Sequence, residues 1–318
     1  MDIYHLSYPN HLFTNDKNDA YSLAIGFFDG VHKGHQAVIK NALEKGKEMN
    51  IKTAVMTFDP HPSLVLGGRK EKVFYITPLQ EKMNILKSFG VDAVFVVRFT
   101  SDFAKLTPEK FIEFFINQTN VKHVTAGFDF SFGAFGKGTM KDMDLLSEGK
   151  YTVSVVGKKE LHGGKISSTR IREELTTGNM EQVRELLGRP FQLTGVVIHG
   201  DKRGRTINFP TANVDPTEGQ FTPATGVYAV KISVQETWHE GVCNVGFKPT
   251  FNNPEEKKLS IEVHIFNFEQ SIYGEEVTVH WYKRIRSEQK FNGIDELKEQ
   301  IGKDKQVAID FFKKEVEL

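Results

Sequence analysis

Residues 22–35 read SLAIGFFDGVHKGH, an apolar strand-like run followed by a glycine-rich turn and the expected start of a helix. Glycines in such a turn let backbone N–H groups approach a phosphate, and the helix N-terminus adds partial positive charge there. His32 and His35 stand three residues apart around the turn and can face the same phosphate oxygens. The stretch therefore predicts a phosphate site at the end of a buried strand.

The two histidines leave three interpretations open. They are metal ligands, they have a structural role at the start of a helix, or they bind phosphate. No third Cys, His or carboxylate stands at the spacing expected for a metal such as zinc. The glycines of the turn favour phosphate binding, because neither of the other interpretations requires them.

Outward from this turn, the first 187 residues alternate short apolar runs with amphipathic stretches. Helical spacing appears in residues 79–86 and 111–115, each behind a Thr-Pro pair that supplies an N-cap and a first-turn proline. This alternation predicts an α/β domain, Rossmann-like, with a mostly parallel sheet covered on both faces. Ligands bind such sheets beyond the carboxyl ends of the strands. The apolar runs are residues 22–28, 53–58, 91–99, 121–127 and 151–156.

After residues 188–190 (Gly-Arg-Pro) the apolar residues alternate with a period of two, most clearly in residues 226–234 and 259–265. Short strands separated by Gly, Pro and Asn predict a small antiparallel β-barrel or sandwich. A helix is expected at residues 294–314, with an apolar stripe that packs on the barrel. We therefore expect two domains, residues 1–187 and 188–318.

The composition excludes several classes of protein. The 318 residues carry 41 Lys+Arg and 41 Asp+Glu, so the formal net charge is zero and no nucleic-acid partner is expected. No apolar run approaches the roughly 18 residues of a membrane span, and no signal-peptide pattern is visible. Cys243 is the single cysteine, which excludes intramolecular disulfides, and we expect it to be buried. We expect a cytoplasmic protein without a membrane partner, and the sequence alone does not decide whether it is a homo-oligomer.

Three further motifs follow the glycine-rich turn in order, at residues 57–62 (TFDPHP), 127–133 (GFDFSFG) and 166–172 (ISSTRIR). Together with the turn they resemble the signature of the nucleotidylyltransferase superfamily, in the version carried by bacterial FAD synthetases. The resemblance implies that the FMN phosphate attacks the α-phosphorus of MgATP, which gives FAD and pyrophosphate. No covalent nucleophile is needed, so positioning and electrostatic stabilisation would carry the rate.

The resemblance also implies roles for residues of the first domain. His32 and His35 are the expected catalytic residues, acting on the triphosphate and the transition state. The residues expected at the flavin are Phe58, Pro60, Phe128 and Asp129. The residues expected to bind the ATP phosphates are Gly26, Phe28, Asp29, Gly30, Gly34, Ser167, Ser168, Thr169, Arg170 and Arg172.

The second half carries a basic, glycine-bearing loop, HGDKRGR at residues 199–205, followed by PTAN at residues 210–213. Such a loop is often only a solvated hairpin. The order of the motifs, however, resembles the riboflavin kinase barrel, with Pro-Thr-Ala-Asn as its hallmark. This resemblance implies phosphoryl transfer from ATP to the ribityl 5′-hydroxyl of riboflavin, and the two resemblances together imply a bifunctional FAD synthetase. The other matching stretches are residues 244–251, 261–264, 272–274 and 285–291.

The kinase chemistry points to particular side chains. The Thr211 hydroxyl and the Asn213 amide oxygen are hard ligands that suit Mg²⁺ beside the phosphates. Glu262 lies on the polar face of a strand with apolar neighbours and is the candidate general base. The resemblance places Arg286 at the flavin. The residues expected at the ATP phosphates are Gly200, Arg203, Gly204 and Arg205.

One position departs from the family pattern. Asn208 precedes Phe-Pro-Thr-Ala-Asn, where the family usually has Gly, and its side chain restricts the backbone and the approach of ATP. The alternative function is therefore an FMN adenylyltransferase alone, with a barrel that is inactive as a kinase or senses flavin. Both hypotheses require Mg²⁺, take ATP and FMN as substrates and give FAD, and the bifunctional one adds riboflavin.

Overall fold

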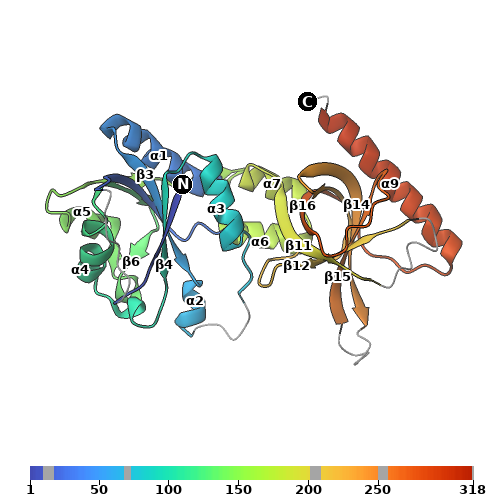
Figure 1. The fold of residues 1–318 in the computed structure, drawn as a ribbon, viewed down its shortest axis with the longest axis horizontal. Helices are drawn as coiled ribbons and strands as arrows, with labels where there is room; N and C mark the ends of the chain where they lie inside the picture. Colours follow the sequence, from blue (N-terminus) through green and yellow to red (C-terminus); the bar gives the residue numbers. More distant parts are fainter. Residues whose placement is uncertain (10–17, 68–72, 201–208, 250–256, 317–318) are drawn as a thin grey trace. The chain divides into compact units, whose positions relative to one another are not determined.

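The chain folds into two compact units, Met1–Ser168 and Thr169–Leu318. The structure is a computed structural model that describes residues 1–9, 18–67, 73–200, 209–249 and 257–316 (Figure 1). Compactness groups the two helices that follow Ser168 with the second unit. The domain limit at residue 187 stays a prediction.

The first unit is built on a six-stranded sheet whose strands are all parallel, in the order β1-β4-β3-β2-β5-β8. Five of these strands coincide with the five apolar runs, which confirms the predicted parallel sheet. The sequence does not predict the edge strand β1, because Tyr4 and His5 interrupt its apolar residues. The strands are β1 Asp2–Leu6, β2 Tyr21–Ile25, β3 Lys52–Asp59, β4 Ala93–Arg98, β5 Val121–Gly127 and β8 Thr152–Val156.

Helices cover both faces of this sheet. On one face, α1 and α3 bring Ile39 and Leu86 into a cluster with Val55 of β3. Helix α1 begins after its N-cap His32 and ends at Asn50, whose left-handed backbone terminates it. The helices of the unit are α1 Lys33–Met49, α2 Pro62–Val65, α3 Leu79–Ser88, α4 Pro108–Phe111, the π-helical η2 Ile112–Asn117 and α5 Met140–Leu145.

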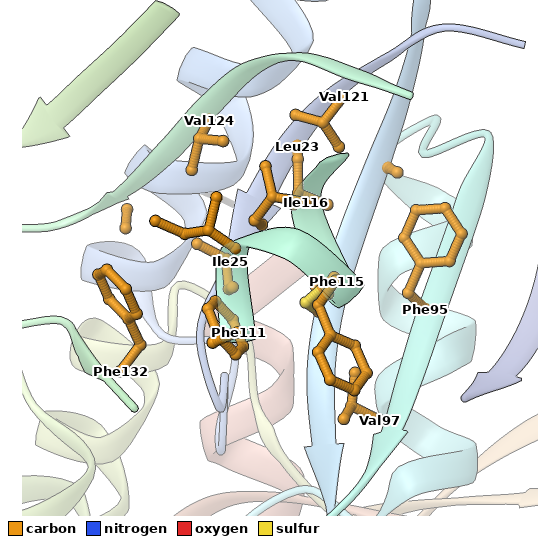
Figure 2. Packing of buried hydrophobic residues seen from close by; sticks show 14 of the residues in the cluster. Leu23, Ile25, Phe95, Val97, Phe111, Phe115, Ile116, Val121, Val124 and Phe132 are labelled. Carbon is orange, nitrogen blue, oxygen red and sulfur yellow. The ribbon is translucent and has the colours of Figure 1, made fainter. Parts of the chain in front are cut away.

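The opposite face of the sheet carries the larger cluster. Phe111 and Phe115 pack over Leu23 and Ile25 of β2 and beside Phe95 of β4 (Figure 2). Each fully buried Phe contributes about 1.5–3 kcal/mol to stability. Because both faces of β2 are buried, its sequence is largely apolar on both faces rather than alternating, and the hydroxyl of its one serine, Ser22, donates to the Ala42 carbonyl at 2.7 Å.

Short elements complete the first unit. Strand β6 pairs with β7 and strand β9 with β10, each as a two-stranded antiparallel ribbon. Their bounds are β6 Ser131–Phe132, β7 Gly138–Thr139, β9 Glu160–Leu161 and β10 Gly164–Lys165, and the 3-10 helices are η1 Phe103–Lys105 and η3 Ala134–Gly136.

The second unit is a closed antiparallel barrel in the order β11-β12-β15-β14-β13-β16, which confirms the predicted barrel. Its strands are β11 Phe191–Ile198, β12 Ala212–Pro216, β13 Gly226–Val234, β14 Thr237–Pro249, β15 Lys257–Ile265 and β16 Glu276–Arg286. Its helices are α6 Ser168–Thr177, α7 Met180–Leu187 and α9 Ile294–Val316.

Helix α9 packs on the outside of the barrel, as the sequence predicts. Its Ala308 and Phe312 are buried in one cluster with Val227, Ala229 and Val242 of the barrel wall. The single Cys243 is buried and free, also as predicted. In the part of the chain that the structure describes, no helix combines the length and the apolar character that crossing a membrane requires.

Candidate active sites

The glycine-rich turn follows β2 and leads into α1. In the sheet β2 lies between β3 and β5, so the strand order reverses at β2. Open α/β sheets bind ligands at such a reversal, beyond the carboxyl ends of the strands. The ends of β3 and β5 lie at the same edge because the strands are parallel. We call the residues at this edge, 26–35, 57–60, 127–129 and 165–168, the first site.

His32 and His35 stack at the start of α1, with ring centroids 3.5 Å apart and ring planes at 18°. His32 is the N-cap, and its Nδ1 accepts a hydrogen bond from the backbone N–H of His35 at 3.2 Å. A ring nitrogen that accepts carries no proton, so the neutral imidazole has its proton on Nε2. The cap therefore gives His32 a structural role and also sets the tautomer that donates from Nε2.

His35 is held in its neutral form. Burial lowers its pKa well below the usual 6.5, and His32, Lys82 and Lys165 lower it further. Its ring meets Phe28 edge-on, with centroids 5.3 Å apart. Its Nδ1 is buried and has no hydrogen-bond partner among the described residues. His35 therefore stands beside His32 as an uncharged ring with one buried nitrogen, unpartnered among the described residues.

The turn between β2 and α1 has unusual backbone conformations. Phe28, Gly30 and Val31 have φ angles of 55°, 88° and 40°. For the two non-glycine residues the left-handed region costs on the order of 1–3 kcal/mol each. Both are almost fully buried, so packing holds the strained turn in place. Gly34 leaves room for the neighbouring ring, because a Cβ there would lie 3.1 Å from His32.

Asp29 uses its carboxylate within the chain. Its Oδ1 accepts from the backbone N–H of Thr77 at 3.1 Å, and its Oδ2 accepts from that of Ile76 at 3.3 Å. Its carbonyl oxygen accepts from the Ser168 hydroxyl at 2.8 Å. The carboxylate of Asp29, which the sequence assigns to the phosphates, therefore links the turn to the segment before α3, and its carbonyl oxygen contacts Ser168. The other predicted residues of the ISSTRIR motif follow on α6 (Thr169, Arg170 and Arg172) or precede it (Ser167).

Two lysines at this edge are absent from the sequence-based set. Lys82 of α3 is buried, and its Nζ donates to the Phe27 carbonyl at 2.8 Å. Lys165 pairs with the Asp129 carboxylate and lies 4.8 Å from the centre of the Phe128 ring. Lys165 directly precedes the ISSTRIR motif, and this position is a signal that could have found it. Lys82 has no such signal, because it lies within an ordinary amphipathic helix.

The predicted flavin residues differ in exposure. Phe58 lies in the core, with its ring centroid 5.8 Å from that of Phe103 and 6.5 Å from that of Phe99. Pro60 is half-buried just beyond the end of β3, whereas Phe128 is 48% exposed. Of the two aromatic rings assigned to the flavin, Phe128 is therefore the one that presents a face to solvent.

In the barrel, Glu262 lies between two asparagines of neighbouring strands. It pairs in register with Asn213 of β12 and with Asn244 of β14, and directly paired residues project from the same face. The Ser260 hydroxyl donates to its Oε1 at 3.1 Å, and the Thr211 hydroxyl donates to its Oε2 at 3.4 Å. The structure thus brings the predicted base and both predicted magnesium ligands together. We call these five residues the second site.

Gly200, just beyond β11, lies against this site. A Cβ at this position would lie 2.3 Å from the amide nitrogen of Asn213, so a larger residue would displace the amide. Four residues named in the sequence analysis lie outside the described residues. They are Asn208, which differs from the family pattern, and the predicted phosphate-binding residues Arg203, Gly204 and Arg205.

A cavity of about 510 Å³ opens beside Thr211. Pro210, Phe268, Ile272 and Tyr273 contribute to its wall. Glu269, Gln270 and Ser271 add polar groups, so apolar and polar side chains share the wall. The second site therefore adjoins a space large enough for one ligand.

Known proteins match both halves of the chain. Residues 14–170 match the family model described as FAD synthetase, and residues 187–312 match the one described as riboflavin kinase. A curated bifunctional riboflavin kinase/FMN adenylyltransferase of Bacillus subtilis is 49% identical over 98% of this chain and 98% of its own length. The chain belongs to this bifunctional riboflavin kinase/FMN adenylyltransferase family. Both resemblances seen in the sequence are thereby confirmed.

Further relatives span nearly the whole chain. The Listeria monocytogenes member of the bifunctional riboflavin kinase/FMN adenylyltransferase family is 45% identical over 96% of this chain and 98% of its own. A crystal structure of a protein described as a macrolide-efflux protein from Streptococcus pneumoniae is 35% identical, with a TM-score of 0.88 over 97% of this chain and 99% of that one. That structure shares the fold of this chain.

In this family member, Arg286 is engaged within the barrel unit. Its Nε lies 3.0 and 3.1 Å from the two carboxylate oxygens of Asp304 on α9, and its Nη2 lies 2.8 Å from Oδ2. Gln300 donates to the same carboxylate at 2.8 Å. The structure therefore places Arg286, which the sequence assigns to the flavin, as an anchor between β16 and the terminal helix.

Proposed function

We propose that this chain phosphorylates riboflavin to FMN in the barrel and adenylylates FMN to FAD in the first unit, with ATP as the phosphoryl donor in the first step and the adenylyl donor in the second. The grouping of Glu262 with Thr211 and Asn213, on a chain that also carries the stacked pair His32 and His35, supports the proposal most directly. Each group is what one of the two reactions requires.

In the adenylyl transfer, an oxygen of the FMN phosphate attacks the α-phosphorus of ATP. The new P–O–P bond joins FMN to the AMP moiety, and the bond from the α-phosphorus to the bridging oxygen breaks to release pyrophosphate. Negative charge builds up on the phosphoryl oxygens in the transition state. The Nε2–H of His32 and the N–H groups at the start of α1 stabilise that charge, and His35 hydrogen-bonds the same phosphates as a neutral ring.

The residues around the histidines support this assignment. Lys165 adds positive charge beside Asp129, and the exposed Phe128 ring offers a face on which the isoalloxazine stacks. The predicted roles of Ser167, Ser168 and the two arginines of the ISSTRIR motif (Arg170 and Arg172) remain proposals of the same kind.

In the kinase step, the ribityl 5′-oxygen attacks the γ-phosphorus of ATP and its proton passes to a carboxylate. Glu262 is that base, because the Ser260 and Thr211 hydroxyls hold its two oxygens in place. The γ-phosphoryl group moves to the flavin, and ADP leaves.

Mg²⁺ would be held in the barrel by Thr211 and Asn213. Both side chains supply the neutral oxygens that Mg²⁺ accepts, and Gly200 leaves space beside the Asn213 amide. Among the described residues no group of three or more His, Cys, Asp and Glu side chains is placed to hold a metal ion. The ion would therefore take its remaining ligands from the phosphates and water, and it would neutralise charge on the triphosphate.

The cavity beside Thr211 fits the adenosine part of ATP. Thr211 lies on its wall and would place the phosphates at the mouth, while the apolar Phe268 and Ile272 would pack against the base. The flavin would then approach from the face that carries Glu262, where its 5′-hydroxyl meets the γ-phosphate.

Chromatography of the flavins formed by the full chain tests the proposal. One reaction contains riboflavin with MgATP, and a second contains FMN with MgATP. FAD from both starting flavins supports the two activities. FAD from FMN alone would favour the alternative, an adenylyltransferase whose barrel does not act as a kinase, and no FAD from either flavin would refute both.

A further inference from the structure

Lys82 is a buried cation that the proposed reaction steps leave without a role. It lies on α3 and is 2% exposed. Its Nζ donates to the carbonyl oxygen of Phe27 at 2.8 Å and to the hydroxyl of Thr57 at 3.2 Å. The same Nζ lies 4.6 Å from the centre of the Phe27 ring. All of these contacts meet the strained turn or the strand end beside it.

The Phe27 carbonyl is where three elements meet. It belongs to the turn after β2, it accepts from Lys82 of α3, and it also accepts from the Thr57 hydroxyl of β3 at 2.9 Å. The next residue, Phe28, begins the left-handed stretch that leads to the stacked histidines. Lys82 therefore holds the backbone one residue before the strain starts.

An apolar side chain would fill this position at lower cost if packing were its only purpose. Burial lowers the pKa of Lys82 from 10.5 to about 8, although Asp29 and Asp59 favour the charged form. Its two hydrogen-bond partners are uncharged groups, and buried lysines without a paired carboxylate destabilise a fold. A charge kept here against that cost points to a role in the neighbouring site.

We propose that Lys82 is a positioning residue for adenylyl transfer, which holds the Phe27 carbonyl and thereby the turn that presents His32 and His35 to the nucleotide phosphates. The proposal rests on the proposed function of the first site. The positive charge of Lys82 also helps to keep His35 neutral, together with His32 and Lys165.

The test compares steady-state FAD formation from FMN and MgATP by the full chain and by Lys82→Met. A displacement of about 1 Å in a catalytic group lowers the reaction rate by on the order of 10²-fold. The kcat for FAD formation should therefore fall by about that factor, while the KM for FMN changes little. Riboflavin phosphorylation by the same preparation should be unchanged. Lys52→Met is the matched control, because Lys52 is an exposed lysine in the first unit, paired with Asp19, and its removal should leave both activities intact.

A second readout separates positioning from a merely structural role. Histidine-labelled protein is titrated by NMR, and in Lys82→Met the pKa of His35 should move up toward its ordinary value, because one of its neighbouring cations is gone. The remaining charged groups that act on His35, namely His32 and Lys165, are unchanged in the variant.

The outcomes separate this proposal from the function on which it rests. If the unmodified chain makes no FAD from FMN, the proposed function fails first. If it does, and Lys82→Met matches its kcat or leaves the His35 titration in place, the positioning role is wrong. If Lys82→Met does not fold, Thr57→Val decides: it removes the other hydrogen bond to Phe27, and we expect a fall in kcat of several fold, whereas an unchanged kcat would overturn the proposal.

Discussion

Replacing Lys82 by Met should change how the stability of the first unit depends on pH. The pKa of this lysine is lowered from 10.5 to about 8 by burial. At about 1.4 kcal/mol per pH unit, keeping the charge buried at neutral pH costs about 3 kcal/mol. The side chain is 2% exposed, so solvent screens this cost little.

The direction in which the unfolding free energy changes with pH follows from proton binding. Between pH 8 and 10.5 the unfolded chain keeps the proton on Lys82 while the folded chain releases it, so folded stability rises with pH across this window. Methionine has no such titration. The unfolding free energy of the unmodified chain minus that of Lys82→Met should therefore rise by about 3 kcal/mol from pH 7.5 to 10.5. The lost hydrogen bonds to Phe27 and Thr57 shift the whole difference curve but not its slope.

Urea unfolding of the full chain measures this difference. Both tryptophans, Trp238 and Trp281, lie in the barrel unit, so their fluorescence follows the barrel alone. Far-UV circular dichroism follows both units, and the transition that fluorescence does not share belongs to the first unit. A difference curve that stays flat from pH 7.5 to 10.5 would refute the reasoning, because it would mean that Lys82 has an ordinary pKa.

Three other substitutions test the sites and the barrel anchor. His32→Ala removes one transition-state donor and the cap of α1, and should lower FAD formation from FMN by on the order of 10²–10³-fold with riboflavin phosphorylation intact; equal turnover in a folded variant would contradict this role. Glu262→Gln should slow riboflavin phosphorylation roughly 10²–10⁴-fold while FMN adenylylation survives, and equal loss of both activities would indicate misfolding instead. Asp304→Ala removes the buried carboxylate that pairs with the half-buried Arg286 guanidinium and should cost about 1.5–3 kcal/mol in the unfolding transition seen by tryptophan fluorescence, whereas a loss below about 1 kcal/mol would mean that the pair does not anchor α9.

Much of the fold follows from periodicity alone. A strand buried on both faces is largely apolar, and the three central strands β2, β3 and β4 have this composition. A barrel strand must alternate, and β15 does so, with Ile261 and Val263 buried and Glu262 between them. The edge strand β1 follows neither of these two patterns. Among the described residues β4 is its one neighbour in the sheet, and its composition is mixed.

Whether a site residue can be predicted depends on whether its partners belong to the same sequence motif or to a distant part of the chain. In the first site the two predicted histidines lie together because both stand at one capped helix start. In the second site Glu262 meets Asn213 because their strands pair in register, and Thr211 directly precedes the strand of Asn213. Lys82 cannot be predicted in this way, because its partner belongs to no motif around it. Its partner is a backbone carbonyl 55 residues away, and nothing in the sequence around it marks that contact.

The same distinction applies to two charged residues, Asp29 and Arg286, whose expected roles at the phosphates and the flavin stay predictions. Asp29 in a glycine-rich turn and Arg286 in a basic motif both look like ligand contacts, because charge in a functional motif usually serves a ligand. Within the chain, Asp29 accepts from the backbone N–H of Thr77, and Arg286 pairs with Asp304. A buried charge must be satisfied by something, and whether that partner is the substrate or a distant part of the chain is decided by the fold. Residue type and spacing therefore predict where the chemistry is, whereas the partners that the chain itself supplies to each charge depend on long-range contacts that only the fold shows.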